Sequence, residues 1–508
     1  VTVGNNNATT YAPYWLPIAE RSDKLGCAAR VTKPVPGGGD RDLASDDCPD
    51  NTLTGANIRL RIEPTINVAE RISIRTQIDI FDNHVMGSTP DSLTGGGLTA
   101  LSEGQATPIA GLNSSRPAVL IKRVWAEWDT GFGLLKVGRM PWHWGLGLMA
   151  NDGECWDCNH GDNVDRISYT GEWFQHRFGV SYDFAGSGPN SSWVDLDANA
   201  TGFQPMNGGQ AVDLEQLDDA DQVVLFVGRI DRPQVLRDRL EQGELVLNYG
   251  GLFVWRKQDF DYLINTDNPG IGVGEAALGR NLREISAWTV TPDLWVKLMW
   301  RRLHVEVEGL ATLGEIGNVS NEVDGEQVVD IFQFGLVARA QYDFLRRRAL
   351  KVGFEFGLAS GDENELYDLN RRRRAQQLDG VHNLGELQFD PDFHVDLILF
   401  REIMGSVANA MYFKPWIQYD FLDTIGARLD VIYSMAHRSV AYPGNNVNLG
   451  LEFDLDLFYK SHDGRVMAGL QYGLLIPFAG LDRPAELYGD QRTTEVAQTL
   501  QTRLVFKF

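Results

Sequence analysis

The chain has 508 residues and a formal net charge of -23, which excludes nucleic acid as an electrostatic partner because phosphates require a basic footprint. Its hydrophobic content of 43% and mean hydropathy of -0.23 suit a soluble protein, and also a membrane β-barrel, whose strands are apolar on one face only. A helical membrane protein is excluded. The best charge-free segment, 466–481, contains Gly473 and Pro477 and is shorter than the roughly 18–20 residues that a spanning helix needs.

The first 56 residues predict one strand followed by a disulfide-stapled loop. The segment 9–20, TTYAPYWLPIAE, is the candidate strand, although it alternates poorly and contains two prolines. Cys27 and Cys48 form a local pair, and even, local pairing of cysteines indicates disulfides and an oxidising compartment. Because residue 1 is Val, we expect that an export leader has been removed.

From residue 57 onward, apolar and polar residues alternate with period two, which indicates strands with two different faces. In NIRLRI, residues 57–62, isoleucine and leucine share one face, while Arg59 and Arg61 share the other. The pattern recurs in 71–81, 303–309, 446–458 and 499–508. About fifteen such segments, with almost no helical period between them, predict an all-β fold.

Short and long connections alternate along the chain, as in outer-membrane barrels with short periplasmic turns and long extracellular loops. The short connections are 68–71, 129–132, 171–174, 301–302, 345–349, 422–426 and 461–464. The long, polar ones are roughly 83–117, 140–164, 185–220, 258–282, 314–327, 360–394 and 479–494. The exception, 230–243, lies on the short-turn side, and we interpret it as a small helix that caps the periplasmic mouth.

We therefore predict that residues 1–508 form a single transmembrane antiparallel β-barrel of about 18 strands, or about 16 if the weakest segments are not strands. Phe508 ends the closing strand, and we expect it at the periplasmic rim, where an aromatic ring is favoured. The alternative fold is a soluble multi-domain β-protein, in which the apolar rows must find partners within the chain.

The polar face of the strands is expected to line the lumen, which is aqueous in a barrel of this size unless something plugs it. The candidate lining or selectivity residues carry both signs of charge: Arg59, Arg61, Arg75, Arg123, His304, Glu306, Glu308, Arg339, Glu355, Glu452, Asp454 and Asp456. One interpretation is a solvated wall braced by ion pairs. The other is separate acidic and basic ladders that select solutes.

The 140–164 loop is the candidate constriction, because it follows an early strand and carries aromatic residues among glycines: Trp142, His143, Trp144 and Trp156. Their rings could stack on sugars or hydrophobic solutes. Alternatively, they anchor the barrel rim or form the loop's own small core.

The same loop contains Cys155 and Cys158, for which we favour a local disulfide. A metal site with His160 and Asp162 is the alternative interpretation of CWDCNHGD. A structural zinc site usually has a second Cys or His pair at a characteristic spacing. The sequence has no such pair, so no metal is predicted.

Two further loop features suggest ligands, and each has a plain alternative. The acid-rich segments 193–200 and 213–221 could bind Ca²⁺, which prefers oxygen ligands, or could be solvated surface. The basic run Arg371–Arg374 could contact lipopolysaccharide phosphates, could attract anions if folded inward, or could be an exposed charge run. No other cofactor is predicted.

The hairpin pattern and the C-terminal phenylalanine resemble Gram-negative outer-membrane porins as a class. Residues 137–169 resemble a segment of uncharacterised barrel proteins of myxobacteria and related deltaproteobacteria. Gly138 and Arg139, followed by a Gly-rich loop, are similar to the alginate-exporter and porin superfamily. These resemblances imply a barrel in the outer membrane of a Gram-negative bacterium and little about its substrate.

The favoured function is a porin or channel for passive or selective diffusion of small hydrophilic solutes. The alternative is a loop-plugged structural or scaffold barrel that binds lipoproteins, lipopolysaccharide or a surface polymer. Expected partners are outer-membrane lipid and lipopolysaccharide, small hydrophilic solutes and, as in many porins, further copies of the chain, or else a lipoprotein. An enzyme is not expected, because the nine histidines fall in no Ser-His-Asp or metalloprotease spacing.

Overall fold

The computed structural model describes residues 2–5, 8–11, 32–34, 40–42, 55–85, 119–185, 219–262, 282–317, 328–344, 349–362, 383–482 and 493–508. The Cys27–Cys48 pair, the Arg371–Arg374 run and the acidic segments 193–200 and 213–218 lie outside these residues. The described part of the predicted first strand lies in β2 (Ala8–Tyr11), which pairs with β1 (Thr2–Asn5) in a separate sheet. A second small sheet pairs β3 (Thr32–Pro34) with β4 (Asp40–Asp42).

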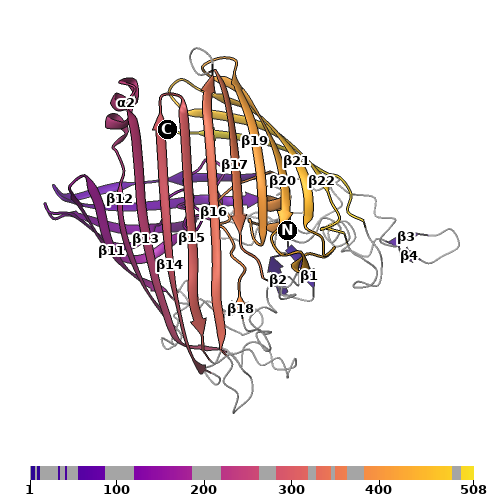
Figure 1. Ribbon diagram of the computed structural model, residues 1–508, viewed down its shortest axis with the longest axis horizontal. Helices are drawn as coiled ribbons and strands as arrows, with labels where there is room; N and C mark the ends of the chain where they lie inside the picture. Colours follow the sequence, from indigo (N-terminus) through magenta and orange to yellow (C-terminus); the bar gives the residue numbers. More distant parts are fainter. Residues whose placement is uncertain are drawn as a thin grey trace, which may run out of the picture.

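A single sheet of nineteen strands carries the rest of the fold (Figure 1). Neighbouring strands pair antiparallel apart from the two-residue β18, so the prediction of an all-β antiparallel barrel of about eighteen strands is confirmed. The strands are β5 (Asn57–Ile62), β6 (Thr65–Ala69), β7 (Ile72–Val85), β8 (Val119–Asp129), β9 (Leu134–Pro141), β10 (Asn163–Trp173), β11 (His176–Ala185), β12 (Ala220–Arg229), β13 (Leu245–Tyr262), β14 (Leu282–Trp300), β15 (Leu303–Ile316), β16 (Val329–Phe344), β17 (Leu350–Ala359), β18 (Asn383–Leu384), β19 (Ala410–Asp420), β20 (Ile425–Ala436), β21 (Asn448–Lys460), β22 (Val466–Pro477) and β23 (Ala497–Phe506).

The two faces of the sheet differ as the alternating sequence predicts. On β14, Leu294 and Val296 are 67% and 42% exposed, whereas Asp293 and Trp295 between and beside them are buried. The outer face is therefore apolar and the inner face carries the polar side chains, as in transmembrane β-barrels. The alternative of apolar rows packed in a dry interior does not fit these exposures. Among the described residues, no helix is long and apolar enough to cross a membrane.

The exceptional connection at 230–243 forms the helix α2 (Pro233–Glu241), as predicted. Proline in the first turn needs no backbone donor there, and Gly243, with a φ of 76°, follows the helix end in the left-handed conformation that glycine favours. Figure 1 shows α2 at the end of the barrel where the C-terminus lies, which is the short-turn end. Phe508 lies beyond β23 at this end and is almost fully exposed.

The first and last strands of the sheet meet at a seam. β5 and β6 pair with successive parts of β7 and act as one interrupted strand, so seventeen long strands remain once β18 is set aside. β23 and β5 are neighbours in the ring. Because the number of long strands is odd and neighbours alternate in direction, these two strands run in the same direction. Among the described residues, registered ladders link every other neighbouring pair of long strands but none links these two. The outer side chains there, such as Leu500 at 69%, are more exposed than Leu455 at 39% in β21.

The apolar outer face predicts a position-dependent cost for charge. Leu294→Arg, in the middle of β14, should lower the free energy of unfolding by about 2–4 kcal/mol, because the guanidinium enters the hydrocarbon region. The control Phe132→Arg, in the β8–β9 turn, should cost about 0–1 kcal/mol. Urea unfolding in liposomes measures both values, and equal costs at the two positions would contradict a lipid-facing β14.

Candidate functional site: two loops folded into the barrel

The 142–162 loop, between β9 and β10, crosses the inside of the barrel. Trp144 donates its indole N–H to Asp293 of β14 at 3.1 Å, and the Leu146 amide donates to Glu308 of β15. On the opposite side of the ring, Arg59 of β5 donates to the Cys158 carbonyl at 3.0 Å. A loop that binds strands so far apart in the ring must span the interior.

The 385–409 loop, between β18 and β19, also folds inward. The amides of Leu397, Ile398 and Leu399 donate to Glu452 of β21 at 3.1, 2.7 and 3.0 Å. From β19, Lys414 donates to the Val395 carbonyl at 2.6 Å. The predicted loop of 360–394 therefore ends too early. The apolar run that follows it forms a short π-helix, Leu399–Met404, instead of starting a strand.

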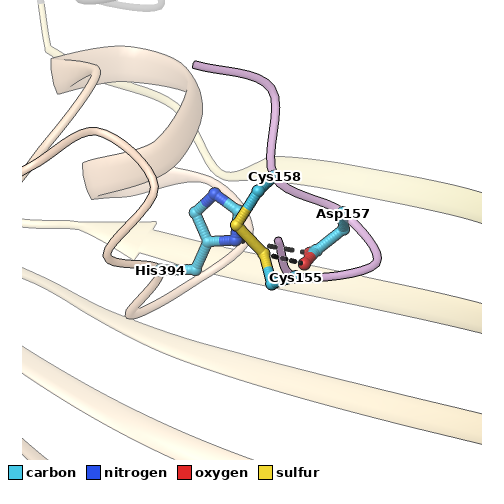
Figure 2. A group of neighbouring side chains, drawn as sticks. All are labelled: Cys155, Asp157, Cys158 and His394. Atoms are coloured by element: carbon cyan, nitrogen blue, oxygen red, sulfur yellow. Dashed lines mark hydrogen bonds and ion pairs between the residues drawn. A yellow bond between two sulfur atoms is a disulfide. The ribbon is translucent and has the colours of Figure 1, made fainter. Parts of the chain in front are cut away.

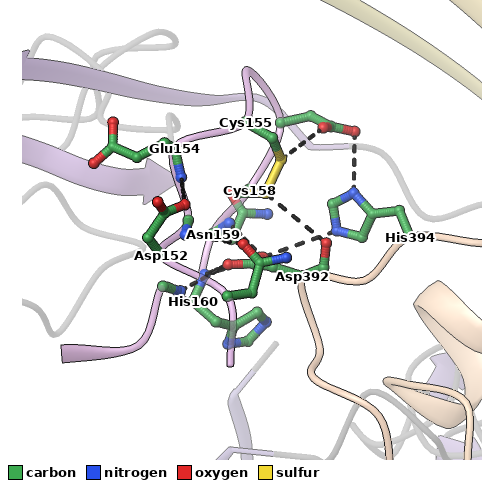
Figure 3. The surroundings of a disulfide bond; sticks show 12 residues. Asp152, Glu154, Cys155, Cys158, Asn159, His160, Asp392 and His394 are labelled. Atoms are coloured by element: carbon green, nitrogen blue, oxygen red, sulfur yellow. Dashed lines mark hydrogen bonds and ion pairs between the residues drawn. A yellow bond between two sulfur atoms is a disulfide. The ribbon is translucent and has the colours of Figure 1, made fainter. Parts of the chain in front are cut away.

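Asp392 joins the two loops (Figure 3). Its carboxylate accepts hydrogen bonds from the amides of Asn159, His160 and Gly161, at 2.8, 3.0 and 2.7 Å. Three converging N–H groups form a concave anion site, here occupied by a carboxylate of the same chain. A further bond runs from the Asp390 amide to the Leu148 carbonyl at 2.7 Å. The loops are therefore one docked unit.

The docked loops form an apolar core against the inner surface of the strands. The loops contribute Leu146, Leu148, Leu387, Phe389, Phe393, Val395, Leu397, Ile398, Leu399, Phe400, Ile403, Met404 and Val407. The strands contribute inward side chains that interrupt an otherwise polar surface, among them Trp295, Leu310, Val337, Tyr412, Ile432 and Leu475. Burial of this apolar area stabilises the docked position, at about 25 cal/mol for each Å² removed from water.

Glycines in the strands make room for loop tryptophans. A Cβ atom at Gly250 of β13 would lie 2.8 Å from the Trp144 ring, and one at Gly469 of β22 would lie 2.9 Å from the Trp156 ring. Real Cβ atoms do not approach other atoms so closely, so glycine is required at both positions while the rings are docked. The inner surface is therefore shaped for these loops.

The predicted aromatic residues of the loop differ in their surroundings. Trp144 is buried among Val224, Leu252 and Val254, so its ring is not available to stack on a solute. The guanidinium of Arg166 lies 4.8 Å above the Trp142 ring. His143 is exposed, 3.7 Å from Asp152. Of these four residues only Trp144 is buried, and its ring docks the loop on the inner face of the strands.

The predicted lining residues all lie on the inner face, but several bind the loops instead of facing an open lumen. The residues that contact the loops are Arg59, Arg61, Arg123, Glu308, Glu452 and Asp454. Others form ion pairs between neighbouring strands: Arg75 of β7 with Glu127 of β8 at 2.7 Å, and Glu306 of β15 with Arg339 of β16 at 3.5 Å. Glu355 accepts from Tyr412 at 2.8 Å. His304 and Asp456 lie on β15 and β21.

Cys155 and Cys158 form a disulfide within the loop, with Cα atoms 5.1 Å apart (Figure 2). The metal set considered from sequence is not assembled among the described residues: the group of ligating side chains around the cysteines includes neither His160 nor Asp162. Instead, Asp157 and His394 join the cysteines, and the ligand atoms of all four residues lie within 4.8 Å of one another. Sequence reasoning missed His394 because it comes from the other loop.

Asp157 is the most heavily engaged carboxylate of this group. It pairs with Arg401 at 2.9 Å, with His394 at 3.4 Å and with Arg503 of β23. Burial alone would raise the pKa of Asp157, but these three partners outweigh it and hold the pKa well below its usual range. Because the same loop binds Arg59 of β5, it spans the seam between the first and last strands from the inside.

No family model and no curated protein matches this chain. Among solved structures it is similar to OccK11 of Pseudomonas aeruginosa, with 9% identity, a TM-score of 0.43 and 88% of each chain covered. It is also similar to OccAB2 of Acinetobacter baumannii, with 10% identity, a TM-score of 0.43, and 88% of this chain and 90% of that one covered.

A third match is OmpF of Salmonella typhi, with 11% identity, a TM-score of 0.33, and 74% of this chain and 81% of that one covered. All three TM-scores lie below 0.5, so we take neither a family nor an activity from these similarities. Similarity to the myxobacterial barrel family or to alginate exporters is not shown.

The contact between the loops predicts a pH dependence centred on Asp390. Burial raises the pKa of Asp390 to about 8, and the negative charges of Asp162 and Asp392 beside it add to the shift. The positive charge of Arg123 acts in the opposite direction on the pKa of Asp162. A raised carboxyl pKa means that docking takes up a proton. Docking should therefore be strongest near pH 4 and weaken as the pH rises toward 8.

Hydrogen exchange of the 158–162 amides measures this effect. Asp390→Asn, which stays neutral, should remove the loss of protection between pH 5 and about 8. Comparing the two proteins at each pH cancels the intrinsic pH dependence of exchange, and Asp463→Asn in the exposed 461–464 turn is the control. Equal protection profiles for wild type and Asp390→Asn would rule out this titration.

Proposed function

We propose that the protein is an outer-membrane channel of a Gram-negative bacterium, constricted by the docked 142–162 and 385–409 loops, for small hydrophilic solutes. The observation that carries this proposal is a barrel with a lipid-facing apolar exterior and a polar interior crossed by two folded-in loops. A barrel of this size leaves an aqueous lumen, and inward loops narrow such a lumen to a selective passage.

The short-turn end of the lumen supports a water-filled vestibule. Glu306 pairs there with Lys297 at 3.3 Å, and Lys351 pairs with Asp420 at 3.0 Å. The Lys297 and Arg339 side chains remain 34% and 41% exposed although they face the interior. Partly exposed ion pairs on an inner surface require water beside them, because unsolvated charges are costly.

A second candidate is a plugged scaffold barrel that binds a lipoprotein, lipopolysaccharide or a surface polymer. The apolar core that the two loops form with the strands favours it, because a rigidly docked plug leaves little passage. Both candidates place the protein in outer-membrane lipid. They differ in whether current crosses the barrel.

Planar-bilayer recordings of purified protein separate the two candidates. Wild type should give stepwise currents, and Asp392→Ala should raise the mean current, because each amide left without an acceptor destabilises loop docking by about 1–3 kcal/mol. Asp463→Ala in the exposed turn should match wild type. Silent bilayers for both wild type and Asp392→Ala, with folding confirmed by circular dichroism, would favour the scaffold.

Ion selectivity tests the vestibule. Glu306→Lys places a third cation beside Lys297 and Arg339, so the ratio of anion to cation permeability should rise. Asp463→Lys makes the same charge change outside the lumen and should leave the reversal potential in a salt gradient unchanged. An unchanged reversal potential for Glu306→Lys would remove this residue from the permeation path.

A further inference from the structure

The cysteine loop and the 385–409 loop assemble four metal-ligating side chains that are distant in sequence. The Sγ atoms of Cys155 and Cys158, a carboxylate oxygen of Asp157 and a ring nitrogen of His394 lie within 4.8 Å of one another (Figure 2). In a tetrahedral zinc site, with Zn–S near 2.3 Å and Zn–N near 2.1 Å, ligand atoms are roughly 3.3–3.8 Å apart. The four groups therefore need only small shifts to surround one ion.

We propose that the reduced form of this loop is a binding site for a zinc-class divalent ion, with Cys155, Cys158, Asp157 and His394 as its ligands. The oxidised form, with the disulfide closed, has no thiolates to offer and does not bind the ion. The site is thus a redox-dependent metal site, and it is independent of whether the barrel conducts.

The orientation of Asp157 suits this role. Its Oδ1 atom lies 3.3 Å from the Cys155 sulfur and so faces the would-be ion, whereas its Oδ2 atom receives the Arg401 guanidinium at 2.9 Å. In metal sites a ligating carboxylate is typically held by a hydrogen bond to its other oxygen, as Arg401 holds Asp157 here.

The His394 ring lies between two carboxylates. Its Nδ1 faces Asp157 at 3.4 Å, and its Nε2 lies 3.9 Å from the carboxylate of Asp392. At 3.9 Å this is not a hydrogen bond, but a shift of roughly 1 Å would place Asp392 as the carboxylate that orients a ligating ring. Figure 3 shows Asp392 itself held by the backbone of 159–161, so the carboxylate is fixed beside the ring.

The charge of the occupied site is also balanced. Two thiolates, one carboxylate and a neutral imidazole around a divalent ion leave one negative charge. Arg401 and Arg503 already lie at Asp157 and offset it. With fewer anionic ligands, the two guanidinium groups beside the site would repel a divalent cation.

The chemistry balances with a dithiol reductant of the thioredoxin class. Two electrons and two protons pass from the dithiol to the Cys155–Cys158 bond, which breaks to two thiols while the dithiol closes to its own disulfide. Binding of the ion then releases both thiol protons to solvent. Cys155 is an exposed residue and Cys158 a buried one, so we expect the reductant to attack the Cys155 sulfur.

Cobalt(II) titration of the folded full-length chain in detergent tests the site. The background variant Cys27→Ser/Cys48→Ser removes the other two cysteines, and a phosphine reduces the remaining disulfide under anaerobic conditions. We expect one equivalent of Co²⁺ to give the visible absorption of tetrahedral cobalt and the near-ultraviolet thiolate charge-transfer band, with Zn²⁺ displacing it. The oxidised protein should give neither band.

Matched variants identify the ligands. His394→Ala and His394→Gln should weaken binding by about tenfold or more, whereas His462→Ala, in the exposed 461–464 turn, should not. Asp157→Asn should weaken it as well, with folding checked by circular dichroism because Asp157 also contacts β23. Absence of the thiolate band in reduced protein, or unchanged affinity in both His394 variants, would overturn the proposal.

Discussion

The interior of this barrel depends on the requirement that buried peptide groups find hydrogen-bond partners. Loops usually stay at the surface because water satisfies their N–H and C=O groups. Here carboxylates take the place of water: Asp392 accepts from three amides of one loop, Glu452 from three of the other, and Asp396 from the start of the π-helix. The acidic character of the inner face follows in part from this demand.

Charge in the lumen therefore serves two purposes that a sequence does not separate. Glu308 and Glu452 hold the backbone of the loops in a buried setting, whereas Glu306, two positions from Glu308, pairs with cations that keep contact with water. Side chains of the first kind set the shape of the passage. Those of the second kind act on whatever moves through it.

Period-two alternation was enough to predict the barrel, the short turns and the inward position of residues such as Arg61 and Asp454, because each strand has its own two-faced pattern. The candidate site was harder to predict from the sequence. The sequence of the 385–409 loop predicts a polar loop followed by a strand. An apolar run such as Leu397–Ile403 fits a strand of the sheet as well as a loop docked against it, and the pattern alone does not distinguish the two. His394 meets the cysteines only through the pairing of two loops more than two hundred residues apart, which no local pattern encodes.

The Asp157–Arg503 contact joins residues separated by 346 positions, and this has a consequence for biogenesis. Contacts between such distant segments form late and slow the folding of β-proteins, because loop-closure entropy must be overcome first. During membrane insertion the seam cannot be bridged from within until β23 has arrived. The growing sheet therefore keeps two free edges, open to lateral addition or to chaperone capture, up to the final step of assembly.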